Sequence, residues 1–133
     1  MATYNIDITS KAIRGSLGSS SDLGKNLVHM HYKFDHSEDS NKVKAITHYL
    51  HDTTGNWLVV GKVGADMMDY RFIRVVIDIA AGSKTEEEKQ DLLRRTLECC
   101  MDYERKNAQK CEIEVRVNEV EKGDVVRIYP AER

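Results

Sequence analysis

One segment, from Tyr70 to Val126, constrains the fold of this chain more than any other part of its sequence. It opens with a nearly unbroken apolar run from Phe72 to Gly82. A capped amphipathic pattern follows, and an alternating stretch then begins at Cys111. The segment therefore predicts a strand, a helix, a second strand and a short final hairpin.

The first of these strands, Phe72 to Ile79, is apolar on both of the faces that a strand presents. A strand of this kind belongs in the centre of a sheet, with both faces covered. A domain of this size rarely covers both faces of its sheet alone. Either another part of the chain or a second subunit must lie over the second face. We favour the second subunit, which predicts a homo-oligomer.

The helix is predicted over residues 85–108, because both its beginning and its apolar stripe are visible in the sequence. Thr85 and Glu88 match a capping box, in which each residue bonds the backbone of the other. Apolar side chains then recur at helical spacing, at Leu92, Leu93, Leu97, Cys100 and Tyr103. One face of this helix is therefore expected to pack on the sheet.

Residues 22–36 are ambiguous between a helix and a strand. Some apolar residues fall at helical spacing, namely Leu23, Leu27, Met30 and Phe34. Others alternate as in a strand, namely Val28, Met30, Tyr32 and Phe34. We favour the strand, because Gly24 and the β-branched and aromatic residues disfavour a helix.

The remaining alternating stretches predict further strands at residues 3–8, 43–50, 57–63, 111–120 and 125–129. The 133 residues fit one domain, spanning residues 1–133. We therefore predict an α+β fold with an antiparallel or mixed β-sheet of about five to seven short strands. One long amphipathic helix, over about residues 85–108, is expected to pack on one face of this sheet.

The composition limits the compartment and the class of partner. The formal net charge of −2 argues against a nucleic-acid binder, because such proteins usually carry a basic excess. No run approaches about 18 apolar residues, so we expect no membrane span. No signal-peptide pattern is visible at the beginning of the sequence, and the three cysteines show no Cys-x-x-Cys spacing. We therefore expect reduced thiols and a cytoplasmic protein.

All five histidines lie between His29 and His51, which makes this region a candidate metal site. On a strand, His29 and His31 would share one face, and a neighbouring strand would bring His48 beside them. Three imidazoles with an open position suit zinc or another divalent metal. The alternative is a solvent-facing surface whose histidines bind water. Because no spacing matches a zinc motif, no cofactor is predicted, and a divalent metal remains the alternative.

Three short motifs surround the predicted helix. They are Ala81-Gly82-Ser83 after the apolar strand, Thr85-Glu86-Glu87-Glu88-Lys89 at the helix start, and Val117-Asn118-Glu119-Val120 at the end of the next strand. With these motifs, residues 72–120 resemble the second half of a tautomerase-superfamily subunit. That family includes 5-carboxymethyl-2-hydroxymuconate isomerases and malonate semialdehyde decarboxylases. The resemblance implies an isomerase or tautomerase, in which Arg71 and Arg74 bind the carboxylate of a small oxo-acid.

Two features depart from the pattern of that family. Its chemistry rests on an N-terminal proline, whereas removal of Met1 from this chain exposes Ala2, a primary amine. An ordinary α-amino group has a pKa of about 7.7–8.0 and is a weak base, so Ala2 is the candidate catalytic residue. The second departure is the glycine-rich stretch from Gly15 to Gly24, which disfavours the first helix of the family's fold.

From these observations we expect a small, soluble, homo-oligomeric binding protein that is non-catalytic and whose ligand is unknown. Its candidate ligands are a small molecule or a protein partner, bound at the histidine face or at the two arginines. Two alternatives stay open. One is a tautomerase- or isomerase-like enzyme that acts on a small oxo-acid, and the other is a metal-dependent enzyme that uses the histidines.

Overall fold

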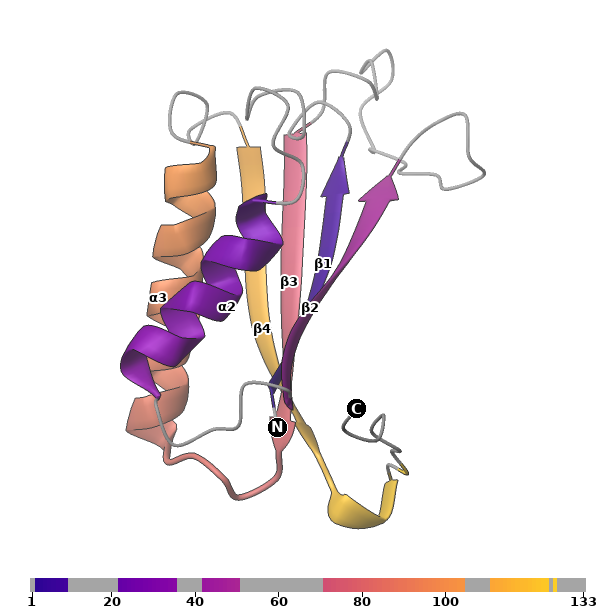
Figure 1. The fold of residues 1–133 in the computed structure, drawn as a ribbon, viewed down its shortest axis with the longest axis vertical. Helices are drawn as coiled ribbons and strands as arrows, with labels where there is room; N and C mark the ends of the chain where they lie inside the picture. The colour runs from indigo at the N-terminus through magenta and orange to yellow at the C-terminus, as the bar shows by residue number, and fades with distance from the viewer. Residues whose placement is uncertain are drawn as a thin grey trace, which may run out of the picture.

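The structure is a computed structural model that describes residues 2–9, 22–35, 42–50, 71–104, 111–124 and 126. Its elements follow in the order β1 (Ala2–Thr9), α2 (Asp22–Phe34), β2 (Val43–Leu50), β3 (Arg71–Ala80), α3 (Glu86–Tyr103), β4 (Cys111–Val120) and the short 3₁₀ helix η4 (Lys122–Asp124). Both α-helices lie against the same face of a four-stranded sheet (Figure 1). None of the described helices is long and apolar enough to cross a membrane.

The sheet consists of two strand–helix–strand units placed side by side. Within each unit the strands are parallel, β1 with β2 and β3 with β4, and the helix makes the crossover. The units join through β1 and β3, which are antiparallel, with Ala2 opposite Ile79 and Ile8 opposite Ile73. The strand order is β2-β1-β3-β4, so β3 lies inside the sheet, as its two-sided apolar sequence predicts.

The core lies between the sheet and the two helices. It contains the helix-facing side chains of the inner strands and the inner side chains of both helices, including Tyr4, Ile6, Ile8, Leu23, Leu27, Ile73, Val75, Ile77, Leu92 and Cys100. The opposite face of the sheet has no described helix over it (Figure 1). We call it the open face, and it carries Asn5, Asp7, Ile46, His48, Arg74, Val76, Asp78 and Glu114.

The helix α2 corrects the sequence interpretation, which favoured a strand over residues 22–36 and only one long helix in the fold. Leu23 and Leu27 are 1% and 0% exposed, and His31, one turn further, is 2% exposed. Burial of this stripe outweighs the weak helix propensity of the segment, because tertiary packing supplies most helix stability in proteins. Gly24 is part of the packing, since a Cβ there would lie 3.3 Å from the Cβ of Ala45 on β2.

The described residues test some of the other expectations about the fold and leave two predicted strands untested. The predicted helix corresponds to α3, and the capping box between Thr85 and Glu88 is present in both directions. The predicted strands at residues 57–63 and 125–129 lie outside the described residues, Val126 excepted. The described sheet is mixed and has four strands, against the expected five to seven.

Replacing Gly24 with valine is expected to lower the free energy of unfolding by about 1–3 kcal/mol, because the added side chain pushes α2 away from β2. Urea denaturation measures this change. Gly123→Val is the matched control, because a Cβ at Gly123 has no heavy atom within 4 Å. The control should change the free energy of unfolding by less than about 0.5 kcal/mol. Equal values for the two variants would contradict the close contact between α2 and β2.

Candidate functional site

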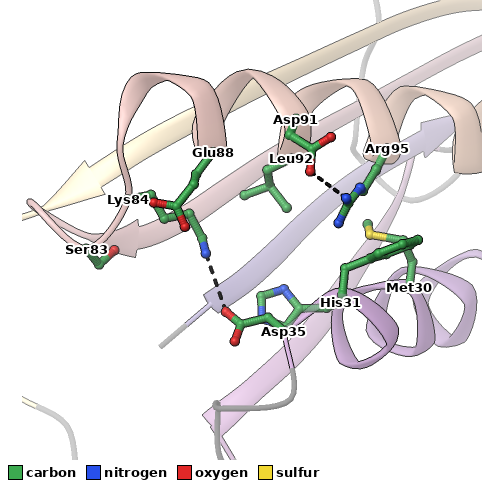
Figure 2. Close-up of a pocket in the computed structure, with 10 residues that line it drawn as sticks. Met30, His31, Asp35, Ser83, Lys84, Glu88, Asp91, Leu92 and Arg95 are labelled. Carbon is green, nitrogen blue, oxygen red and sulfur yellow. Dashed lines mark hydrogen bonds and ion pairs between the residues drawn. The ribbon is translucent and has the colours of Figure 1, made fainter.

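A pocket of about 290 Å³ lies between the C-terminal end of α2 and the N-terminal half of α3 (Figure 2). We call it the interhelical pocket, and it is lined by Met30, His31, Phe34, Asp35, Ser83, Lys84, Glu88, Asp91, Leu92 and Arg95. Because α2 precedes β2 and α3 follows β3, the pocket lies at the end of the sheet where β1 begins. The position matters because Ala2, the candidate catalytic residue, is the first residue of β1.

One buried imidazole lines this pocket. The Nδ1 atom of His31 lies 2.8 Å from the hydroxyl oxygen of Tyr4, and the two rings meet edge to face with their centroids 5.8 Å apart. Tyr4 is fully buried and shares the helix-facing side of β1 with Ala2, two residues away. A histidine held in one orientation by a buried phenol is suited to accept and donate a proton.

Two cationic side chains line the same pocket, and each is held by a carboxylate (Figure 2). The Nζ of Lys84 lies 3.4 Å from Oδ2 of Asp35, which links the turn after β3 to the end of α2. Arg95 lies 2.7 Å from Oδ2 of Asp91, and its guanidinium carbon stacks 3.6 Å from the ring centroid of Phe34. Because charge-assisted hydrogen bonds are usually about 2.7–2.9 Å, the Lys84 contact is long, and an anionic ligand can compete for that ammonium group.

The two arginines predicted to bind a substrate carboxylate lie away from this pocket. Nη1 of Arg71 is 3.0 Å from Oε2 of Glu104, whose side chain is 0% exposed. Arg74 donates to Oδ2 of Asp7 from Nε at 3.0 Å and from Nη2 at 2.7 Å. Each predicted anion-binding group therefore has a carboxylate partner within its own subunit.

The register of the sheet separates both arginines from Ala2. Ile79 stands opposite Ala2, and Arg71 and Arg74 lie eight and five residues back along β3. At about 3.3 Å per residue, these separations correspond to roughly 26 Å and 17 Å. A ligand beside Ala2 would therefore meet these arginines only if they came from another copy of the chain.

The three histidines predicted to bind a metal do not converge. On the helix, His29 is exposed and His31 is buried in the core. His48 lies on the open face, with Nδ1 3.4 Å from Asp7, so the sheet separates it from His31. Across the described ranges, no group of three histidine, cysteine, aspartate or glutamate side chains is placed to hold a metal ion. The prediction that His29 and His31 share one face is wrong, because the predicted strand that carries them is a helix.

The cysteines are not poised as nucleophiles. All three are free thiols. Burial raises the pKa of Cys99 to about 11 and that of Cys111 to about 12, and burial also raises the pKa of Cys100. Because the thiolate is the reactive form, these thiols are inert near neutral pH.

Solved structures show which proteins share this fold. A 5-carboxymethyl-2-hydroxymuconate isomerase from Deinococcus radiodurans R1 matches with a TM-score of 0.74 and 11% identity, over 97% of this chain and 90% of that chain. The protein Pt0534, inactivated by 2-oxo-3-pentynoate, matches with a TM-score of 0.69 and 17% identity, over 92% of this chain and 89% of that chain. A fused 4-OT wild-type symmetric trimer matches at 0.60 and 20% identity, over 92% and 89% of the two chains. No family model and no curated protein sequence matches this chain.

These likenesses show that the chain has the fold of tautomerase-superfamily subunits, as the motifs in residues 72–120 predict. The likeness extends over both strand–helix–strand units, including α2. It also corrects the expectation of a non-catalytic binding protein. Proteins that share the fold include isomerases by name, which favours the tautomerase- or isomerase-like alternative.

The sequence did not reveal Tyr4, Lys84 or Arg95 as residues of a site. One signal was available, because Leu23, Leu27 and His31 recur at intervals of four residues. Had residues 22–36 been interpreted as a helix, a histidine on the buried stripe would have pointed to a site between this helix and the sheet.

The hydrogen bond between Tyr4 and His31 predicts a difference between two tyrosine variants. Tyr4→Phe should lower the free energy of unfolding by about 1–3 kcal/mol, because it leaves a buried ring nitrogen without this partner. Tyr32→Phe is the matched control, because the Tyr32 hydroxyl is buried and has no hydrogen-bond partner among the described residues. The control should be neutral or stabilising, since it removes a buried unsatisfied group. Chemical denaturation at one pH compares the two, and equal losses would contradict the assignment.

A second prediction concerns the pH dependence of stability. Burial raises the pKa of the Glu104 carboxyl, against the opposing charge of Arg71. The folded state therefore binds this proton more tightly than the unfolded state, whose glutamate pKa is about 4.3. The resulting stabilisation is complete below that value and is lost as the pH rises through the folded pKa. Relative to Glu104→Gln, the wild type should lose stability between pH 4 and neutral pH in urea titrations. A constant difference would contradict the raised pKa.

Proposed function

We propose that the protein is a tautomerase- or isomerase-like enzyme that moves a proton within a small oxo-acid. The observation that carries the proposal is the buried His31 in the interhelical pocket, beside two cationic side chains and near the start of β1. The fold supports it, because proteins of the same fold are isomerases by name. The volume of about 290 Å³ suits a small ligand rather than a polymer.

The proposed chemistry needs one group that takes a proton from one atom of the substrate and returns a proton to another. In the conversion of an enol to a keto acid, the enol oxygen loses a proton, and the carbon at the far end of the C=C double bond gains one as the carbonyl forms. His31 is placed for this role, because its imidazole lines the pocket and the Tyr4 hydroxyl, 2.8 Å from Nδ1, fixes the orientation of the ring. Lys84 would bind the substrate carboxylate in place of Asp35 and so orient the reacting carbon.

The α-amino group of Ala2 is a second candidate for proton transfer. Once Met1 is removed, an amine with an ordinary pKa of about 7.7–8.0 would be partly unprotonated at neutral pH. Ala2 lies between Val43 and Ile79 at the start of β1, on the same strand face as Tyr4. A comparison of chains with and without Met1 tests this role, because only the processed chain carries the Ala2 amine.

We further propose that the protein acts as a homo-oligomer. A protein of the same fold is described as a symmetric trimer. On the open face, Ile46 is 44% exposed and Val76 is partly exposed, so a second copy would bury apolar surface there. A partner copy could also bring Arg71 or Arg74 towards a ligand at Ala2, which one subunit alone does not do.

The enzyme proposal is tested by the tautomerisation of phenylpyruvate, followed by ultraviolet absorbance. His31→Gln should lower kcat/KM by at least about 100-fold, because a general acid–base group contributes about 10²–10⁴. His29→Gln is the matched control on the exposed side of the same helix and should stay within about twofold of the wild type. Activity that survives His31→Gln would contradict the role of the imidazole. A wild-type protein that is inactive on phenylpyruvate and on other 2-oxo acids would overturn the proposal.

A further inference from the structure

A second cavity lies between the two helices, further along them than the interhelical pocket. Its volume is about 570 Å³, and we call it the outer groove. It is lined by residues of α2 that include Asn26 and His29, and by residues of α3 that include Glu98 and Cys99. Because β1 and β3 are antiparallel, the two crossover helices run in opposite directions, and earlier turns of α2 lie beside later turns of α3. The outer groove therefore continues the interhelical pocket along the line where the helices meet.

Two side chains stand between these cavities. Phe34 of α2 and Arg95 of α3 line both of them, as Met30 also does. The guanidinium carbon of Arg95 lies 3.6 Å from the centroid of the Phe34 ring, and Oδ2 of Asp91 holds the same guanidinium at 2.7 Å. Side chains that line two neighbouring cavities form the wall between them. We call the stacked pair of Phe34 and Arg95 the partition.

Burial does not explain the position of the Phe34 ring. Phe34 is 50% exposed and lies outside the buried core. Cations hold the ring instead, because the Nζ of Lys33 lies 5.7 Å from its centroid in addition to the stacked Arg95. Attraction between a cation and an aromatic face persists at exposed positions. The stack therefore holds the partition between the helices, and a substitution at Phe34 removes it without removing a core side chain.

The polar groups of the interhelical pocket give a bound oxo-acid a direction. Lys84 and Arg95 lie at opposite ends of the pocket, and His31 lies between them (Figure 2). In the proposed reaction the substrate carboxylate is at Lys84 and the reacting carbon is at His31. The remainder of the substrate then points towards Arg95 and Phe34, where the partition ends the pocket.

We infer that Phe34 and Arg95 determine the length of the substrate, because they close the interhelical pocket towards the outer groove. The inference rests on the proposed function, and it narrows the substrates to 2-oxo acids whose side chain ends at the partition. With the partition in place, a ligand has the pocket of about 290 Å³. Without it, the outer groove of about 570 Å³ becomes continuous with the pocket and admits a longer side chain.

Isothermal titration calorimetry of the full-length protein tests the inference, with straight-chain 2-oxo acids from 2-oxobutanoate to 2-oxodecanoate. In the wild type, the affinity should stop rising when the alkyl chain reaches the partition. In Phe34→Ala it should continue to rise, because each further buried CH₂ group strengthens binding about fourfold. The ratio of the 2-oxodecanoate affinity to the 2-oxobutanoate affinity should therefore exceed the wild-type ratio at least about tenfold. Arg95→Ala removes the other half of the stack and should raise the same ratio.

Two further variants separate the partition from a general loosening of the helices. Leu97→Ala also shortens an exposed apolar side chain, but Leu97 lines neither cavity, so this control should keep the wild-type ratio within about twofold. Phe34→Trp keeps an aromatic ring at the wall and should retain the length limit. Circular dichroism verifies that each variant is folded.

The remaining outcomes count against the inference. An unchanged ratio in both Phe34→Ala and Arg95→Ala would overturn it. A wild type whose affinity rises through the whole series would also overturn it, as would a wild type that binds none of these acids at millimolar concentrations. The titration needs no turnover, so phenylpyruvate tautomerisation decides the enzyme proposal separately. A protein that shows the length limit without tautomerase activity would overturn the enzyme proposal and leave the partition as the limit on the bound acid.

Discussion

The antiparallel pairing of β1 with β3 is the contact on which the rest of the described subunit depends. It joins the two strand–helix–strand units and places Ile6 opposite Val75 in one buried layer. Because side chains alternate along a strand, this register puts the apolar stripes of both strands on one face, where α2 and α3 cover them. A shift of one residue would turn one of these stripes towards the open face. The same register brings the beginning of β1 beside the end of β3, and the interhelical pocket forms over that end of the sheet.

The pocket places polar groups where an apolar core would be more stable. Tyr4 and His31 bury a phenol and an imidazole in the same layer as Leu23 and Leu27. One hydrogen bond offsets the desolvation of such groups only in part, and apolar side chains of similar shape would avoid that cost. This pair fixes the direction of one ring at the wall of a cavity, which is what proton transfer to a bound molecule needs. The arrangement is therefore better explained by chemistry in the pocket than by a gain in stability.

Local pattern was sufficient to predict β3, α3 and β4, because each carries its own signal in consecutive residues. The capping box at Thr85 and the alternation after Cys111 are signals of this kind. The helix α2 was missed because Gly24, Val28 and the aromatic residues of the segment obscure a stripe that becomes clear only when the helix packs on the sheet. The pocket was missed for a related reason. Tyr4 and His31 are 27 residues apart, and Asp35 and Lys84 are 49 apart, so no local spacing shows that they meet.

On the open face, charged side chains pair with polar or charged side chains of the neighbouring strands. Asp7 holds both Arg74 and His48, and Asp78 accepts hydrogen bonds from Asn5 at 3.0 Å and from Asn118 at 2.9 Å. A charge that is already paired costs less to bury than an isolated one, because its hydrogen bonds persist when water leaves. These cross-strand pairs therefore allow a second subunit to cover the open face without leaving those carboxylates unpaired.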